Sequence, residues 1–142
     1  MNSIIQITSP DEEEFKQIIN YISLFELDNR ELNASQFLAA KKDDVILGFG
    51  RIRRHSTCDE LCSLGVIEPE RNKNIGSELT KKLIQSSKQP LYLVCIIPEF
   101  FERFGFKIVT EFPPELNEKL NYCTSELVVP EKYVVMKYFG GK

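Results

Sequence analysis

Long hydrophobic runs are missing from this sequence. The longest wholly apolar stretch, LYLVCII at 91–97, is far shorter than the roughly 20 residues that a helix needs to span a bilayer. The N-terminal stretch MNSIIQITSPDEEEF has no basic region and soon becomes acidic, so we expect no secretory signal peptide. We therefore expect a soluble, cytoplasmic protein that has no membrane partner.

A large excess of either charge is also missing. Eighteen Lys and Arg residues against 21 Asp and Glu residues give a formal net charge of −3, with the two signs interspersed. Such a surface does not attract nucleic acid. The basic stretch RIRRH at 51–55 is the feature that would support binding to DNA or RNA, and that binding would be sensitive to salt. We expect no nucleic-acid partner.

Paired metal-binding cysteines and the common nucleotide-binding loops are absent as well. No CxxC pair occurs, and a zinc site built on two of the cysteines with His55 would lack a fourth ligand. We therefore predict no metal site, and reduced thiols in a chain without a secretion signal. Neither GxxxxGK[ST] nor GxGxxG is present. The four cysteines are Cys58, Cys62, Cys95 and Cys123.

Hydrophobic periodicity predicts alternating strands and helices. Residues 9–27 form a helix with Ser9 as the N-cap, Pro10 at the first helical position and acidic residues in the first turn. Residues 36–55 read as two strands around the polar turn KKDD, followed by a third strand at 60–67. The later predicted elements are a helix before 86–90, a buried strand at 91–97, a short helix at 98–106, a strand at 106–112, a helix at 113–127 and a final strand at 132–139.

The chain has 142 residues, enough for one well-buried core and too few for two ordinary domains. No repeat, linker or low-complexity tract divides it. We predict a single α/β domain over residues 1–142, with a central mixed, mostly antiparallel sheet flanked by helices.

The stretch ERNKNIGSEL at 70–79 stands between a strand and a helix. Backbone N–H groups from about Asn72 to Ser77 lie at the mouth of that helix, where unpaired donors and the helix dipole favour an anion. Gly76 allows close approach to the main chain, and Asn74 tolerates a left-handed conformation. The loop is either a phosphate cradle or an ordinary polar helix start.

Two motifs resemble a known family. LCSLGVIEPERNKNIGSELTKKLI at 61–84 is similar to the central motif of the GNAT N-acetyltransferase superfamily, a strand ending in L-x-V followed by [RQ]-x-x-G-x-[GA] and a helix. FFERFGFKIV at 100–109 resembles the family's F-Y-E-K-x-G-F-x-x-V segment. With the preceding hairpin, the similarity covers roughly residues 35 to 110.

The resemblance implies acetyl-CoA as the cofactor and direct attack of a substrate amine on its thioester carbonyl. The pantetheine arm would follow the strand that holds Leu64, Gly65 and Val66, and the Val66 amide would polarise the carbonyl. The pyrophosphate would rest on backbone amides in the loop. The loop residues are Arg71, Asn72, Lys73, Asn74, Ile75, Gly76 and Ser77, with Asn74 where the family usually has glycine.

Catalytic groups follow from the same resemblance. Glu60 matches a position where some members carry a glutamate base, and His55 is a second candidate for base or substrate contact. Phe101 stands where the family often has the tyrosine that protonates the leaving thiolate. Tyr92 and Tyr122 are the candidates to supply that proton.

Substrate recognition has weaker signals. Arg51 and Arg53 share one strand face, and the forked donors of arginine suit a carboxylate. The helix before the last strand resembles amino-acid N-acetyltransferases of the superfamily. We therefore expect an acetyltransferase acting on a primary amine of a small molecule, an amino acid being one option. A CoA-binding or partner-binding module with the same fold is the alternative, and homodimer formation is left open.

Overall fold

A computed structural model describes residues 5–67, 74–126 and 133–140. Seven strands are hydrogen-bonded in the order β1-β2-β3-β4-β5-β7-β6. β4 pairs with β5 in parallel, whereas β1–β2, β2–β3, β5–β7 and β6–β7 are antiparallel. The predicted α/β class with a mixed, mostly antiparallel sheet is confirmed. In chain order the elements are β1 (Gln6–Thr8), α1 (Glu12–Phe25), the 3-10 helix η1 (Ala34–Gln36), β2 (Phe37–Lys42), β3 (Val45–Arg54), β4 (Asp59–Val66), α2 (Ile75–Ser86), β5 (Leu91–Cys95), α3 (Pro98–Glu102), β6 (Phe106–Ile108), α4 (Pro114–Glu126) and β7 (Val134–Tyr138).

Contacts group the residues into two compact units. The first unit comprises Met1–Ile52 and Ser63–Ser86, and the second comprises Arg53–Cys62 and Ser87–Lys142. Each unit has a hydrophobic core of its own. A single domain over residues 1–142 stays a prediction.

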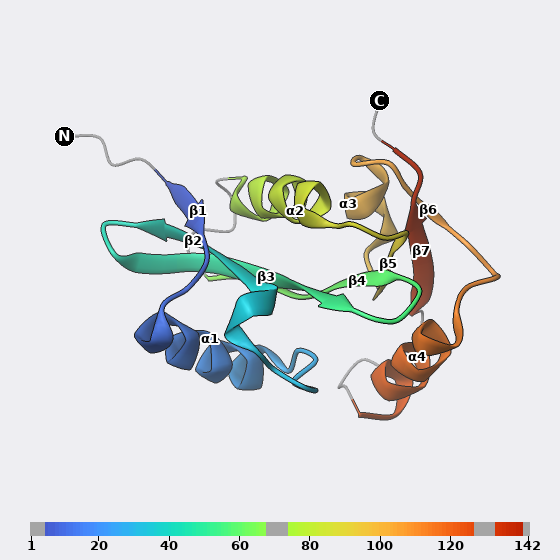
Figure 1. The fold of residues 1–142 in the computed structure, drawn as a ribbon, viewed down its shortest axis with the longest axis horizontal. Helices are drawn as coiled ribbons and strands as arrows, with labels where there is room; N and C mark the ends of the chain where they lie inside the picture. Colours follow the sequence, from blue (N-terminus) through green and yellow to red (C-terminus); the bar gives the residue numbers. More distant parts are fainter. Residues whose placement is uncertain (1–4, 68–73, 127–132, 141–142) are drawn as a thin grey trace. The chain divides into compact units, whose positions relative to one another are not determined.

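In the first unit, α1 and α2 lie on opposite faces of the strands (Figure 1). Ile18 and Ile22 of α1 pack with Phe37 of β2 and Phe49 of β3. On the other face, α2 and its neighbouring strands form a second cluster. That cluster contains Ala40, Leu47, Ile75 and Leu79. Within the first unit, α2 therefore packs directly against β2 and β3.

Small residues on β3 allow α2 to approach the strands closely. A Cβ atom added at Gly48 would lie 3.0 Å from side-chain atoms of both Ile75 and Leu79, and one at Gly50 would lie 2.8 Å from Leu83. A side chain at either position would force these helix side chains to shift, so glycine favours the close approach of α2.

The start of α1 differs from the prediction. Asp11, not Ser9, is the N-cap: its side chain accepts a hydrogen bond from the Glu14 amide at 2.8 Å, and Glu14 Oε1 accepts one from the Asp11 amide at 2.9 Å. Pro10 therefore precedes the helix and does not occupy its first position. This reciprocal capping box satisfies two helix-terminal donors, which a cap at Ser9 would leave to solvent.

The predicted hairpin and its polar turn are confirmed. β2 and β3 pair in antiparallel register across Asp43 and Asp44, whose φ values are 54° and 68°. Two successive left-handed residues match the twist of the flanking strands, and aspartate tolerates that conformation better than most residues.

In the second unit, α4 packs on the strands. Leu116 of α4 lies in a buried cluster with Cys58, Tyr92 and Val135. Four phenylalanines around α3 and β6 form edge contacts, with centroids 4.9 Å apart for Phe100 and Phe101. The other pairs join Phe100 to Phe104 and Phe101 to Phe106. These contacts agree with the core role that aromatic clusters usually have.

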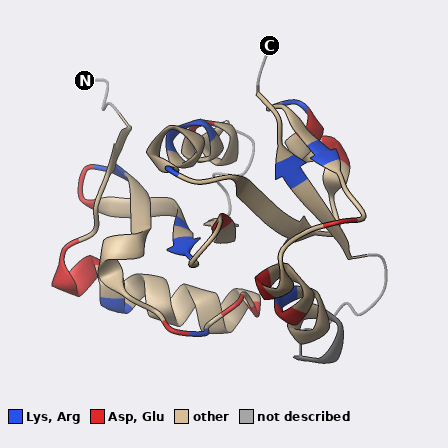
Figure 2. Cartoon of the chain, turned by 45° about the vertical axis from the view of Figure 1, so that its right-hand side comes forward, with Lys and Arg blue, Asp and Glu red and all other residues tan. Residues whose placement is uncertain are grey.

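Charged residues of both signs are spread over the elements, and the acidic start of α1 is visible in Figure 2. Among residues 5–67, 74–126 and 133–140, no helix combines the length and the apolar character that a membrane span requires.

Candidate active site

The predicted site residues separate into two groups, one in each unit. The cofactor residues Leu64 to Ser77 belong to the first unit, and Glu60, Arg53 and the two tyrosines belong to the second. Arg71, Asn72 and Lys73 lie outside the described residues.

Asn74 opens α2 in the conformation that its sequence position predicts. Its φ value is 64°, which is left-handed, and its carbonyl accepts the first helical hydrogen bond, from the Glu78 amide at 3.0 Å. The conformation is confirmed, whereas the role in cofactor binding stays a prediction. In any α-helix the amides of the first turn have no acceptor within the helix itself, which makes a helix start a place where an anion can bind.

The core fixes this helix end. Ile75 is 1% exposed and packs with Leu79 in the cluster between α2 and the strands. One turn later, the Thr80 hydroxyl donates to the Gly76 carbonyl at 2.7 Å. Buried anchoring of Ile75 therefore fixes the first turn of α2 on the strands.

The second half of β4 is strained and closely packed. Ser63 has a φ value of 56°, and its hydroxyl donates to the Asp28 carbonyl at 2.8 Å. A Cβ at Gly65 would lie 2.7 Å from the Phe49 ring. A left-handed serine within a strand indicates a local irregularity of the kind found beside functional sites.

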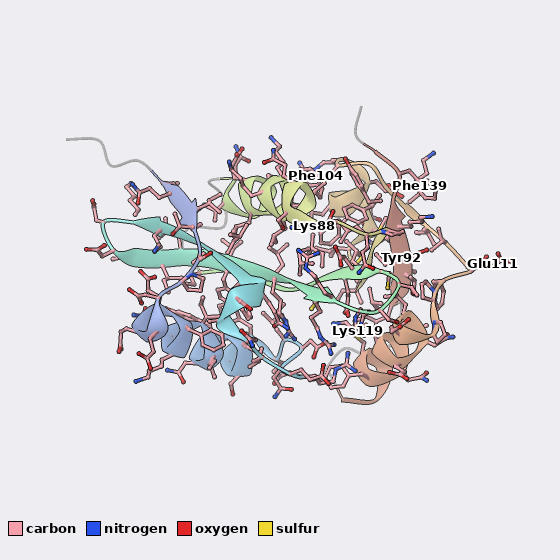
Figure 3. All side chains as sticks on the ribbon, viewed as in Figure 1. Lys88, Tyr92, Phe104, Glu111, Lys119 and Phe139 are labelled. Atoms are coloured by element: carbon pink, nitrogen blue, oxygen red, sulfur yellow. The ribbon has the colours of Figure 1, made fainter. Side chains whose placement is uncertain are left out.

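Glu60, at the start of β4, is the centre of a buried ionic cluster. Its Oε1 atom lies 2.9 Å from His55 Nε2 and 3.7 Å from an Arg53 guanidinium nitrogen. Lys119 of α4 places its ammonium 3.1 Å from the other oxygen, Oε2. Figure 3 shows Lys119 on α4 and Tyr92 on β5. Glu60 is fully buried, and Arg53 and Lys119 are 7% and 3% exposed.

The electrostatics of the cluster keep Glu60 ionised. Burial by itself raises the pKa of a carboxyl group, but the His55 hydrogen bond and the charges of Lys119 and Arg53 outweigh it and lower the pKa of Glu60 to about 2. A carboxylate with so low a pKa holds a proton weakly. Its role as the base stays a prediction.

Hydrogen bonds fix the β3–β4 turn that carries His55. The His55 amide donates to the Cys58 carbonyl at 2.8 Å, and Gln89 Nε2 donates to the His55 carbonyl at 2.9 Å. Asp59, which is fully buried, accepts hydrogen bonds from the amides of Lys88 and Gln89. Burial by itself raises the pKa of Asp59, but the hydrogen bond from Gln89 Nε2, these two amide bonds and the charge of Arg54 outweigh it and lower the pKa.

Arg51 is buried among groups of its own chain. Its side chain has no exposed surface, and it donates to Ser63 Oγ and Gln36 Oε1, both at 2.9 Å, and to the Arg30 carbonyl at 3.0 Å. Asp28 contributes a carbonyl acceptor at 3.1 Å and a carboxylate oxygen at 3.6 Å. Arg51 therefore fixes the segment between α1 and β2, and its substrate role stays a prediction.

The two candidate tyrosines occupy different elements. Tyr92 on β5 is 8% exposed, is the register partner of Glu60 and has the Lys137 ammonium 5.7 Å from its ring. Tyr122 is half-buried on α4. Phe101, where the family often has tyrosine, is 5% exposed. The role of either tyrosine as the proton donor to the thiolate stays a prediction.

The cysteines are free thiols, as predicted, and all four are buried. Burial raises the pKa of both Cys58 and Cys95 to about 11. Neither is a thiolate near neutral pH, so neither is suited to act as a nucleophile.

Lys119 is the residue of the cluster that the sequence did not reveal. It lies four residues after Glu115, which accepts a hydrogen bond from the Ser56 hydroxyl at 3.3 Å, so one face of α4 meets the β3–β4 turn. A single lysine on a predicted amphipathic helix carries no sequence signal for a buried partner 59 positions earlier.

Comparisons with known proteins agree with this fold. The sequence profile of the acetyltransferase (GNAT) family matches residues 1–106. No curated protein matches the chain in sequence. One similar solved structure is N-acetylglutamate synthase from Neisseria gonorrhoeae complexed with coenzyme A and N-acetyl-glutamate, with a TM-score of 0.75 and 15% identity over 97% of this chain and 35% of that chain. A second is Rv2747 from Mycobacterium tuberculosis in complex with CoA and NLQ, with a TM-score of 0.73 and 16% identity over 94% of this chain and 98% of that chain. A third is Arabidopsis thaliana Naa50 in complex with the bisubstrate analogue CoA-Ac-MVNAL, with a TM-score of 0.65 and 17% identity over 94% of this chain and 97% of that chain.

The chain spans about a third of the length of the N-acetylglutamate synthase. At these identities the solved structures show likeness of fold alone. The family profile covers most of the chain and confirms the enzyme class predicted from the two motifs. By this match the chain belongs to the acetyltransferase (GNAT) family.

Proposed function

We propose that the protein transfers the acetyl group of acetyl-CoA to a primary amine of a small molecule, with amino acids as the acceptor class to test first. The observation that carries the proposal is the left-handed Asn74 at the mouth of α2, the helix that follows the motif strand β4 in the chain. An anion bound there would meet outward amides and the positive end of the helix dipole.

The residues of β4 and α2 suit acetyl-CoA, which supplies an acetyl group activated as a thioester. The amides of Ile75, Gly76 and Ser77 would hold the pyrophosphate, together with the preceding loop from Arg71. The backbone at Leu64 and Gly65 would bind the pantetheine arm. The Val66 amide would stabilise the charge that develops on the thioester oxygen.

The acceptor side of the proposal rests on the second unit. Arg53 would bind a carboxylate of the substrate, since its guanidinium lies in a buried cluster beside Glu60. The related N-acetylglutamate synthase was solved with an N-acetylated amino acid, whereas Naa50 was solved with a peptide conjugate. Amino acids and peptide N-termini are therefore the two acceptor classes to compare. A cytoplasmic location and a homodimer stay predictions.

Thiol release from acetyl-CoA tests the proposal. We expect release with an amino acid such as L-glutamate and less with the peptide MVNAL. The control is Gly76→Asp, which places a carboxylate in the proposed pyrophosphate site and should abolish release with every amine. Release that Gly76→Asp leaves unchanged would refute the cofactor site, and release with the peptide alone would refute the small-molecule acceptor.

One observation favours a second function, a CoA-binding or partner-binding module. Phe101 has no proton to give to the leaving thiolate. Because a thiol has a pKa of about 8.5, an unassisted thiolate still leaves near neutral pH, and we favour the enzyme. A protein that binds acetyl-CoA and releases no thiol with any amine would support the module.

A further inference from the structure

His55 and Glu60 form a pair that the cofactor site does not use. The ring atom Nε2 of His55 lies 2.9 Å from Glu60 Oε1. Since a carboxylate only accepts hydrogen bonds, Nε2 carries the hydrogen in this contact. The tautomer that results leaves a lone pair on Nδ1.

Glu60 is badly placed to meet a substrate. It is fully buried and lies against Arg53 of β3, His55 of the β3–β4 turn and Lys119 of α4. Two of these partners are permanent or strongly basic cations, and they compete with any proton for its oxygens. A carboxylate in this position is better suited to orient a neighbour than to accept a proton from an amine.

His55 is less completely enclosed than Glu60. Its side chain is 15% exposed, and the part of the chain that the structure describes offers no hydrogen-bond partner to Nδ1. The backbone on both sides of the ring is fixed by the bonds to Cys58 and Gln89. An imidazole with one nitrogen held by a carboxylate, and the other bound to no group of the described chain, has the arrangement that positions a histidine as a base.

The geometry points to His55 Nδ1 as the group that takes the proton from the acceptor amine, with Glu60 as the positioning residue behind it. This inference rests on the proposed acetyl transfer and assigns its base. Lys119 and Arg53 hold the Glu60 carboxylate in place.

The step balances in atoms and charge. The amine nitrogen forms a bond to the acetyl carbon, the carbon–sulfur bond breaks, and the electron pair leaves with the thiolate. An ammonium substrate loses two protons in becoming an amide. His55 Nδ1 accepts them in turn, one reaches the thiolate, and the other is released to solvent.

A single histidine in the chain makes the first test unambiguous. Nitrogen NMR of the full chain with labelled histidine, recorded where the ring is neutral, should show the Nε2–H tautomer. In Glu60→Gln, whose amide can donate as well as accept, the two tautomers should mix. A ring protonated at Nδ1 in the wild type would overturn the inference, whether or not any amine is acetylated.

The second test is kinetic and uses an amine that gives thiol release with the wild type. His55→Ala should lower kcat about 100-fold, the scale of a lost general base, and added imidazole should restore part of it. Ser56→Ala, the next residue in the same turn, is the matched control and should retain full turnover. Undiminished turnover in His55→Ala would overturn the inference.

Binding separates this inference from the proposed function. The stabilisation of His55→Ala by acetyl-CoA should equal that of the wild type, because His55 belongs to the acceptor side. Loss of that stabilisation in His55→Ala would overturn the assignment as a base. Lack of stabilisation in the wild type would instead refute the acetyl-CoA site.

Discussion

Replacement of Arg51 by methionine should destabilise the fold strongly and should do so without any substrate. The variant keeps the length of the side chain and removes its charge. It removes the Arg51 hydrogen bonds to Ser63 Oγ, to Gln36 Oε1 and to the carbonyls of Asp28 and Arg30. The Asp28 carbonyl keeps the Ser63 hydroxyl as a donor, and Gln36 Oε1 keeps the Asn33 amide. All of these groups surround a guanidinium that has no exposed surface.

The magnitude follows from opposing terms. Four short hydrogen bonds to a charged donor are lost, each worth about 1.5–3 kcal/mol, while the cost of burying the cation is recovered. Asp28 keeps Arg30 as a partner at 3.0 Å, which limits the loss. We expect a fall in the free energy of unfolding of about 3–5 kcal/mol, and of roughly 10–15 °C in the melting temperature.

Urea unfolding monitored by circular dichroism measures this difference. Arg54→Met is the matched control, because Arg54 lies on the same strand with 48% of its side chain exposed and pairs with Asp59 at 3.0 Å. It should cost about 1 kcal/mol or less. A change below about 1 kcal/mol for Arg51→Met would refute the structural role and favour the earlier prediction that Arg51 binds substrate.

Three further predictions concern other parts of the chain. The pKa of Glu60 is lowered from 4.5 to about 2, so its ionisation should contribute about 3 kcal/mol of stability above pH 4.5, and this contribution should be lost as the pH falls toward 2. In urea unfolding, the difference in unfolding free energy between the wild type and Glu60→Gln should therefore narrow over that pH range. A difference that stays constant with pH would contradict this prediction. Gly50→Ala would bring a Cβ within 2.8 Å of Leu83 Cδ1 and should cost about 1–3 kcal/mol in thermal unfolding, where an unchanged midpoint would be the contrary result. Gly76→Asp should keep its fold by circular dichroism and lose acetyl-CoA binding in calorimetry, and retained affinity would argue against the site at α2.

Local signals in the sequence predicted local structure well. The polar KKDD turn, the strand at the start of the motif and the left-handed Asn74 were all readable, because each depends on residues next to it in the chain. The predicted N-cap of α1 was wrong by two positions, because both Ser9 and Asp11 precede an acidic first turn and either side chain could cap the helix. Only the reciprocal bond between Asp11 and Glu14 decides among them.

Tertiary contacts explain what the sequence did not reveal. Arg51 and Arg53 alternate on one strand face and look equivalent in sequence, yet Arg51 is held by the segment before β2, whereas Arg53 lies beside Glu60. The partner Lys119 comes from α4, far along the chain. No periodicity encodes such contacts, because they depend on how distant elements pack.

Thermal unfolding with and without acetyl-CoA tests the central claim, that this GNAT chain binds and uses acetyl-CoA, most directly. At about 100 times its dissociation constant, a ligand adds roughly 2.7 kcal/mol, which should raise the melting temperature by about 5–10 °C in a domain of this size. We predict this shift with acetyl-CoA and none with ATP or NAD. A folded, cofactor-free sample whose midpoint does not move with acetyl-CoA would contradict the account.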